Sequence, residues 1–281
     1  LQRTQFLPRR SESMTVSTPH DTDAPQPKFR KDYLPPNFMV DSVALEFDLE
    51  EEETIVRAKI AVVRSGAAGA PLVLNGEELE TLSVAVDGAS RSSDGYAVDG
   101  DELTIPDVPD RFTLETTVRI HPEKNTSLMG LYKSSGNFCT QCESEGFRRI
   151  TWFLDRPDVM ATYQVTLTAD RAKYPVLLSN GNRISQEDLG DGKHRVVWED
   201  PFKKPSYLFA VVAGDLHCHR GDFKTMTGRS IDLEIYVEPR DADKCEHALG
   251  SLQRSMKWDE EQFGLEYDLD LYMIVAVSDF N

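Results

Sequence analysis

The chain has 281 residues, of which 40% are hydrophobic and 9% aromatic, enough to bury a sizeable core and to exclude a disordered protein. Its formal net charge of −17 has the wrong sign for a nucleic-acid binder and for a protein held on an anionic membrane surface. Four cysteines are too few for a disulfide framework in a chain of this length, so a reducing compartment is expected. The length suggests one large domain or two of ordinary size.

The first 28 residues differ in composition from the rest. They contain Arg3, Arg9, Arg10 and several Ser and Thr, but one acidic residue before Asp21. This bias is typical of an organelle transit peptide and equally of a disordered arm. The protein is predicted to be soluble and intracellular, in the cytoplasm or in an organelle such as a chloroplast or mitochondrion. Because the chain begins at Leu1 and ends directly after an apolar run, it is predicted to be incomplete at both ends.

Residues 29–215 are predicted to form an all-β domain. Apolar residues alternate with polar ones from Asp41 onward, the period of strands with one wet face. The candidate strands are residues 43–49, 56–62, 82–88, 112–120, 162–170, 174–182, 194–200 and 206–214. Asn75-Gly76 and Asn180-Gly181 are typical hairpin turns. Many short strands without intervening helices favour an antiparallel saddle or sandwich.

The pattern changes after residue 215, and residues 216–281 are predicted to begin an α+β domain that the chain leaves incomplete. Residues 222–239 read as a hairpin, and residues 269–277 as a strand buried on both faces. Between them a helix is predicted, with Asp241 as N-cap and Gly264 after its end. Its apolar stripe consists of Cys245, Leu249, Leu252, Met256 and Phe263.

Two motifs suggest metal or redox chemistry. Cys139-x-x-Cys142 could be half of a zinc knuckle or a redox pair, but a zinc knuckle needs a second pair and a thioredoxin-like motif needs a βαβ setting. Two buried, inert thiols is the favoured interpretation. His217 and His219 share one face of a predicted strand, but no third ligand stands nearby, so a solvated strand is favoured.

The polar residues around the two cysteines form a second group of candidates. The cluster of Arg148, Arg149 and the Asp155-Arg156-Asp158 segment is interpreted as a structural charge network in preference to a ligand site. Gln141 and Glu143 flank Cys142, so in an extended segment their side chains point the same way. A carboxylate beside an amide acceptor suits a primary ammonium group, although exposed Gln and Glu are common on strands.

The stretch "GNFCTQCESEGFRRITWFLDRPDVMATYQVTLTADRAKYPVLLSNGN" resembles the N-terminal β-domain of the aminopeptidase N family of zinc-dependent gluzincin aminopeptidases, in its bacterial and plant-type form. The resemblance continues through "DPFKKPSYLFAVVAGD" and "SMKWDEEQFGLEYDLDLYMIVAVSDFN" and so covers about residues 29–281. It implies an N-terminal β-saddle followed by the start of a thermolysin-like catalytic domain.

The resemblance also implies roles for particular residues. Gln141 and Glu143 match the residues that bind the free α-amino group of a peptide, and the complete enzyme would remove N-terminal amino acids with zinc as cofactor. The family's Met-Glu-Asn loop and its His-Glu-x-x-His helix do not occur in this sequence. No catalytic residue and no metal ligand is therefore assigned to this chain, and the 281-residue segment alone is predicted to be inactive.

Two other functions are compatible with the sequence. The chain could be a non-catalytic β-module that binds peptides or a partner protein, because the sequence stops before the metal motif. An epoxide hydrolase on the same scaffold is a third possibility. The expected partners are peptides with a free N-terminus, and neither nucleic acid nor a membrane is expected.

Overall fold

The computed structural model describes residues 29–278. The chain divides into two compact units, Leu1–Pro35 and Pro36–Asn281. Within the first unit, residues 29–35 contain a short 3-10 helix, η1 (Arg30–Asp32). The extension predicted at residues 1–28 lies outside the described residues, and its character stays a prediction. All elements below belong to the second unit.

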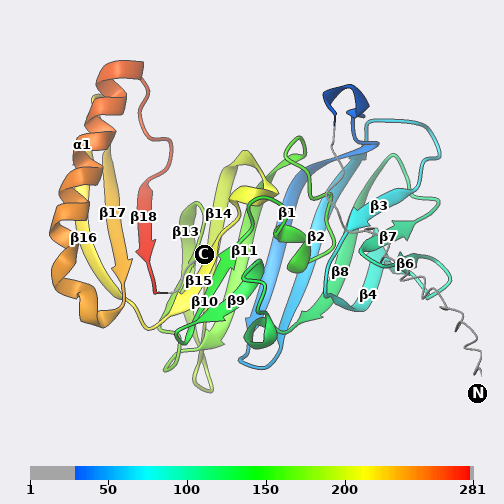
Figure 1. Ribbon diagram of the computed structural model, residues 1–281, viewed down its shortest axis with the longest axis horizontal. Coiled ribbons are helices and arrows are strands. Elements are labelled where there is room, and N and C mark those ends of the chain that lie inside the picture. Colours follow the sequence, from blue (N-terminus) through cyan, green and yellow to red (C-terminus); the bar gives the residue numbers. More distant parts are fainter. Residues whose placement is uncertain (1–28, 279–281) are drawn as a thin grey trace, which may run out of the picture. The chain divides into compact units, whose positions relative to one another are not determined.

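The largest sheet has eight strands in the order β13-β14-β11-β1-β2-β8-β4-β5 (Figure 1). One of its faces is buried, because apolar and polar residues alternate: in β1, Val43, Leu45 and Phe47 are at most 1% exposed. Neighbours are antiparallel except β1 and β11, which run parallel with Leu45 opposite Val165. The strands are β1 (Phe38–Leu49), β2 (Thr54–Arg64), β4 (Glu80–Val86), β5 (Ala89–Ser90), β8 (Arg111–Ile120), β11 (Met160–Asp170), β13 (Asn182–Gly190) and β14 (Lys193–Pro205).

Two smaller sheets share the hydrophobic core of the large one. Trp198 in β14 donates its indole N–H to the carbonyl of Leu177 in β12 at 3.1 Å, and Phe47 stacks on Phe209 with ring centroids 6.2 Å apart. The first small sheet, in the order β12-β15-β10-β9, consists of β9 (Gly130–Ser134), β10 (Asn137–Gln141), β12 (Val176–Ser179) and β15 (Val211–Gly214); the second, β3-β7-β6, of β3 (Leu72–Asn75), β6 (Ala97–Asp99) and β7 (Glu102–Ile105). The all-β prediction is therefore confirmed, with one parallel pair that the alternation pattern could not show.

The last part of the chain folds as the predicted strand–strand–helix–strand (Figure 1). β16 (His217–Lys224) and β17 (Ser230–Val237) form a hairpin, and β18 (Leu271–Ala276) pairs parallel with β17. Helix α1 (Cys245–Phe263) packs on this sheet. They enclose a second core of Ile231, Leu233, Ile235, Val237, Cys245, Leu249, Leu252 and Met256.

The helix ends at Gly264 as predicted, but its predicted N-cap and one residue of its predicted apolar stripe were wrong. A 3-10 helix, η5 (Pro239–Lys244), precedes α1, whose N-cap position is Lys244 rather than Asp241. Proline is well accepted in the first turn of a helix, so the helical backbone already begins at Pro239. At the other end Phe263 is 64% exposed and packs edge-on against Trp258, while Glu260 takes the core-facing position of the last turn.

Three other local predictions were also wrong. β18 is half-buried rather than buried on both faces, because among residues 29–278 it pairs with β17 alone and forms a sheet edge. Neither Asn75-Gly76 nor Asn180-Gly181 closes a hairpin: Asn75 is the last residue of β3, Asn180 and Gly181 form a bend, and each dipeptide leads from one sheet into another. Gly181 is required because its φ is +90° and a Cβ would lie 2.1 Å from the carbonyl oxygen of Glu199.

The predicted domain boundary at 215/216 falls between β15 and β16, where the second core begins. Tyr236, Met273 and Val275 nevertheless pack on the first core, and Pro36–Asn281 form one compact unit. The boundary therefore stays a prediction. The remaining 3-10 helices are η2 (Pro122–Lys124), η3 (Phe147–Arg149) and η4 (Ser206–Leu208).

Gly264→Ala is expected to destabilise the protein by about 1 kcal/mol. Gly264 ends α1 in the left-handed conformation, with φ 64° and its N–H bonded to the carbonyl of Glu260 at 2.9 Å. Gly250→Ala within α1 is the control: it needs no positive φ and meets only the flexible end of Arg254, so it should be neutral or stabilising. Urea unfolding of both variants measures the change in stability, and equal unfolding midpoints would contradict the prediction.

Candidate functional site

Gln141 and Glu143 lie where β10 ends. Gln141 is the half-buried last residue of this strand, and Glu143 is exposed in the turn that follows. The chain leaves the extended conformation at Cys142, so the expectation of an extended segment through Glu143 was wrong. The turn still brings the two residues together, because the Gln141 side-chain amide Nε2 donates to the Glu143 carbonyl oxygen at 3.2 Å. The Glu143–Ser144 peptide bond is cis.

The turn is tight because Gly146 closes it. Its N–H donates to the Cys142 carbonyl oxygen at 2.8 Å, and the chain then enters η3. A Cβ at Gly146 would lie 2.3 Å from the carbonyl oxygen of Gln141 and 3.0 Å from the backbone nitrogen of Gly130. The close approach of these backbone segments therefore requires glycine at this position, a requirement that no local pattern in the sequence shows.

Asp155 lies buried under this turn, with its side chain 1% exposed. Its Oδ2 accepts from both the backbone N–H and the Nε of Arg148, each at 3.1 Å. Its Oδ1 accepts from the hydroxyl of Ser206 in η4 at 2.6 Å. Both carboxylate oxygens are thus bonded, as a buried charge requires. Sequence reasoning placed Arg148 and Asp155 in one network but missed Ser206, which is 51 positions away.

Arg149 braces the same turn from the other side. Its guanidinium contacts Glu77 at 2.8 Å and Glu78 at 2.7 Å. The backbone N–H of Glu77 also donates to the carbonyl of Arg148 at 3.0 Å. These ion pairs support the interpretation of the two arginines as part of a structural charge network, in which Glu77 and Glu78 were not identified from the sequence.

The two cysteines of the Cys-x-x-Cys motif are both free and buried. Burial raises the pKa of the Cys139 thiol from 9.0 to about 11. Burial raises the pKa of Cys142 still further, and the negative charge of Asp155 adds to the effect. Neutral, buried thiols are poor nucleophiles and poor metal ligands, which supports the interpretation of Cys139 and Cys142 as scaffold.

Cys139 and Cys142 are expected to resist alkylation by iodoacetamide at pH 8 in the native protein, while the half-buried Cys218 reacts first. Because the folded Cys139 keeps its proton to about pH 11 and the unfolded thiol loses it near 9.0, stability should fall as pH rises from 9 to 11. Mass spectrometry of peptides after timed labelling measures the order. Early modification of Cys139 would contradict it.

His217 and His219, the other candidate metal ligands, are not joined by further ligands in the described residues. His219 Nε2 lies 3.4 Å from a carboxylate oxygen of the exposed Glu246, and within residues 29–278 no three His, Cys, Asp or Glu side chains are grouped as a metal site. The solvated-strand interpretation of His217 and His219 is retained.

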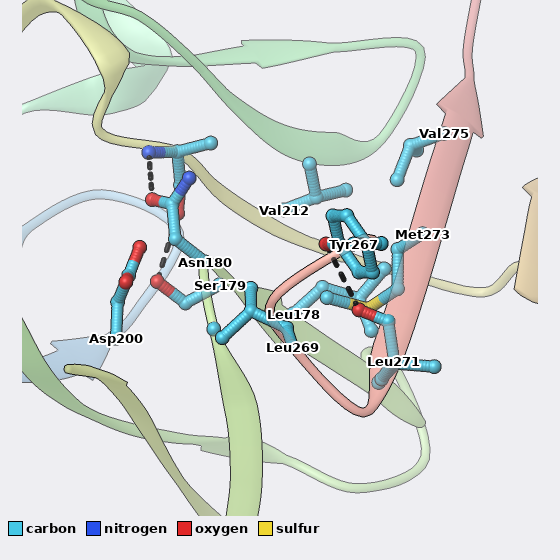
Figure 2. A pocket seen from close by; sticks show the side chains of 12 residues that line it. Leu178, Ser179, Asn180, Asp200, Val212, Tyr267, Leu269, Leu271, Met273 and Val275 are labelled. Carbon is cyan, nitrogen blue, oxygen red and sulfur yellow. Dashed lines mark hydrogen bonds between the residues drawn. The ribbon is translucent and has the colours of Figure 1, made fainter. Parts of the chain in front are cut away.

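A hollow of about 220 Å³ lies elsewhere, between the β12–β15 region and the segment that leads into β18 (Figure 2). Leu178, Val212 and Met273 form part of its apolar wall. Asn180 at its polar end already accepts the backbone N–H of Ala210 at 2.7 Å. Neither Gln141 nor Glu143 lines this hollow.

Residues 40–208 match the model of the Peptidase M1 N-terminal domain. The chain belongs to this family. Aminopeptidase N of Caulobacter vibrioides is 53% identical over 260 residues, which cover 92% of this chain and 30% of that protein. A crystal structure of Legionella pneumophila aminopeptidase A in complex with aspartic acid superposes with a TM-score of 0.84 at 37% identity, over 87% of this chain and 29% of that one.

A third match is an M1 zinc metallopeptidase from Deinococcus radiodurans, with a TM-score of 0.72 at 15% identity, over 85% of this chain and 56% of that one; it shows a shared fold. The chain thus spans about 30% of the length of the two aminopeptidases from Caulobacter and Legionella. The resemblance to the aminopeptidase N family is confirmed. The zinc that this family implies finds no suitable donor group within residues 29–278. No helix in the described part of the chain is long and apolar enough to cross a membrane.

Proposed function

We propose that this chain supplies the substrate-amine site of a zinc metalloaminopeptidase, in which Glu143 and Gln141 hold the free α-amino group of a peptide. The observation that carries the proposal is the braced turn after β10, which leaves Glu143 exposed and holds its backbone carbonyl on the side-chain amide of Gln141. Membership of the M1 family and aminopeptidase relatives over 92% of the chain support it.

The chemistry of the pair suits an ammonium ligand. The carboxylate of Glu143 would accept a charge-assisted hydrogen bond from the substrate. The Nε2 of Gln141 is engaged with the Glu143 carbonyl, which leaves Oε1 as the acceptor that the amide offers. A fixed acid at one end of a cleft sets the register of an exopeptidase, because only the first residue of a peptide carries a charged amine.

The complete enzyme is proposed to be zinc-dependent, with the metal held by residues outside the described part of the chain. No step at the metal is assigned to residues 29–278, and the 281-residue segment alone is proposed to be inactive. We further propose an intracellular location, in the cytoplasm or an organelle.

The test compares peptides with free and with acetylated N-termini as substrates of the complete enzyme, meaning the gene product that contains this chain. Release of the first residue from free peptides only is expected, with no hydrolysis by the 281-residue segment. Turnover of both peptides at equal rates would overturn the amine site. Tight binding of peptides without any hydrolysis would support the non-catalytic β-module instead.

A further inference from the structure

We propose that Asp155 is a positioning residue for the amine site, which acts by fixing the turn that carries Glu143. The inference rests on the proposed function, because positioning has a measurable meaning only if Glu143 binds the substrate amine. Asp155 itself is buried and does not touch the substrate in this proposal.

Asp155 ties together two segments that are distant in sequence. Arg148, at the end of the turn, donates its backbone N–H and its Nε to Oδ2, and its Nη2 donates to the Asp155 carbonyl at 3.2 Å. Ser206 in η4 donates to Oδ1 at 2.6 Å. A single carboxylate therefore fixes both the backbone and the side-chain direction of Arg148 relative to η4.

The position of Arg148 sets the position of Glu143 because the segment between them is short and anchored at both ends. Cys142 and Phe147 are 2% and 0% exposed, so both ends of the turn are anchored in the core. Only residues 143–145 between them are exposed, and the bond from the Gly146 N–H to the Cys142 carbonyl closes the turn. A shift at Arg148 must therefore be taken up within the span that carries Glu143.

The buried Arg148–Asp155 ion pair is better explained by the orientation that it imposes on Arg148 than by a contribution to the stability of the fold. A buried pair adds little net stability relative to apolar residues of the same volume, because both charges lose their hydration. It does fix directions, since each bond has a preferred distance and angle. Asp155→Asn keeps the size of the side chain but removes its charge and leaves one acceptor oxygen, which cannot accept from Arg148 and Ser206 at once.

The experiment compares two inhibitors of the complete enzyme that differ only in the α-amino group, leucine hydroxamate and its desamino analogue. The amine preference is the inhibition constant of the desamino analogue divided by that of leucine hydroxamate. Asp155→Asn is expected to lower this ratio about tenfold or more, with the desamino inhibitor unaffected. Asp158→Asn is the matched control: Asp158 pairs with Arg156 at 2.7 Å in the next turn, and its substitution should leave the ratio unchanged.

A role in stability alone would lower the melting temperature of Asp155→Asn but leave the ratio intact, and this result would overturn the inference. In a Glu143→Gln background, Asp155→Asn should cause no further loss of amine preference, because both act through the same carboxylate. If Asp155→Asn does not fold, Ser206→Ala removes one of the bonds to Asp155, and a smaller loss in the same direction is expected; an unchanged ratio there would equally refute the inference.

The two proposals fail in different ways. Full amine preference in Glu143→Gln would refute the proposed function, whatever Asp155→Asn shows. Loss of preference in Glu143→Gln together with full preference in Asp155→Asn and Ser206→Ala would refute only the positioning role.

Discussion

Glu143→Ala is expected to lower kcat/KM of the complete enzyme about 30- to 1,000-fold, which corresponds to about 2–4 kcal/mol of transition-state binding. The carboxylate is exposed in the described part of the chain and is free to receive a cationic group. Its removal would leave the substrate ammonium without its counter-charge in the proposed binding site. The loss should fall on substrates with a free amine.

Steady-state kinetics on an alanyl amide measure the effect, with Glu145→Ala as the matched control. Glu145 is an exposed acid in the same turn, and its carboxylate lies 3.6 Å from the guanidinium of Arg148. Arg148 keeps its two shorter bonds to Asp155 when this long contact to the mostly exposed Glu145 is removed, so the control should change little. Unchanged kinetics in Glu143→Ala would place the ammonium elsewhere. Equal losses in both variants would indicate general disruption of the turn.

The strands with one buried face could be predicted from the sequence, whereas β13, which has no buried residue, and β10, which is buried on both faces, were missed. The alternation of Val43, Leu45 and Phe47 reports that face directly, whatever the strand pairs with. The alternation of apolar and polar residues does not predict which strands pair with each other. The parallel contact of β1 with β11 joins residues more than a hundred positions apart, and a bend such as Asn180-Gly181 does not specify which sheet the next strand enters.

The residues of the candidate site could be predicted from the sequence, but the contacts that hold the turn in place could not. The inertness of Cys139 and Cys142 followed from the lack of partner ligands, and their burial agrees with it. The end of β10 at Gln141 could not be foreseen, because it depends on the close approach of Gly146 to Gly130. The bond from Ser206 to Asp155 likewise depends on how η4 packs in the folded domain.

Gly146→Ala is expected to destabilise the protein by about 3 kcal/mol or more, at the upper end of the cost of overpacking. The added Cβ would meet three backbone atoms: the Gln141 carbonyl oxygen at 2.3 Å, the Cys142 Cα at 2.9 Å and the Gly130 nitrogen at 3.0 Å. Backbone atoms cannot rotate away as the end of a flexible side chain can, so β9, β10 or the turn must move. For a chain of this size the melting temperature should fall by about 6–12 °C, measured by circular dichroism.

Gly95→Ala is the control for Gly146→Ala. Gly95 also needs no positive φ, and its nearest neighbour would be the Ser92 carbonyl oxygen at 3.2 Å, which a small loop shift relieves. A near-wild-type melting temperature is expected there. If Gly146→Ala were as stable as Gly95→Ala, the backbone around the turn would be compliant, and a compliant turn could not hold Glu143 in one place. The stability of a variant that touches no substrate therefore bears directly on whether the amine site is preorganised, because the contact that makes Gly146 necessary is also the contact that ends β10 at Gln141.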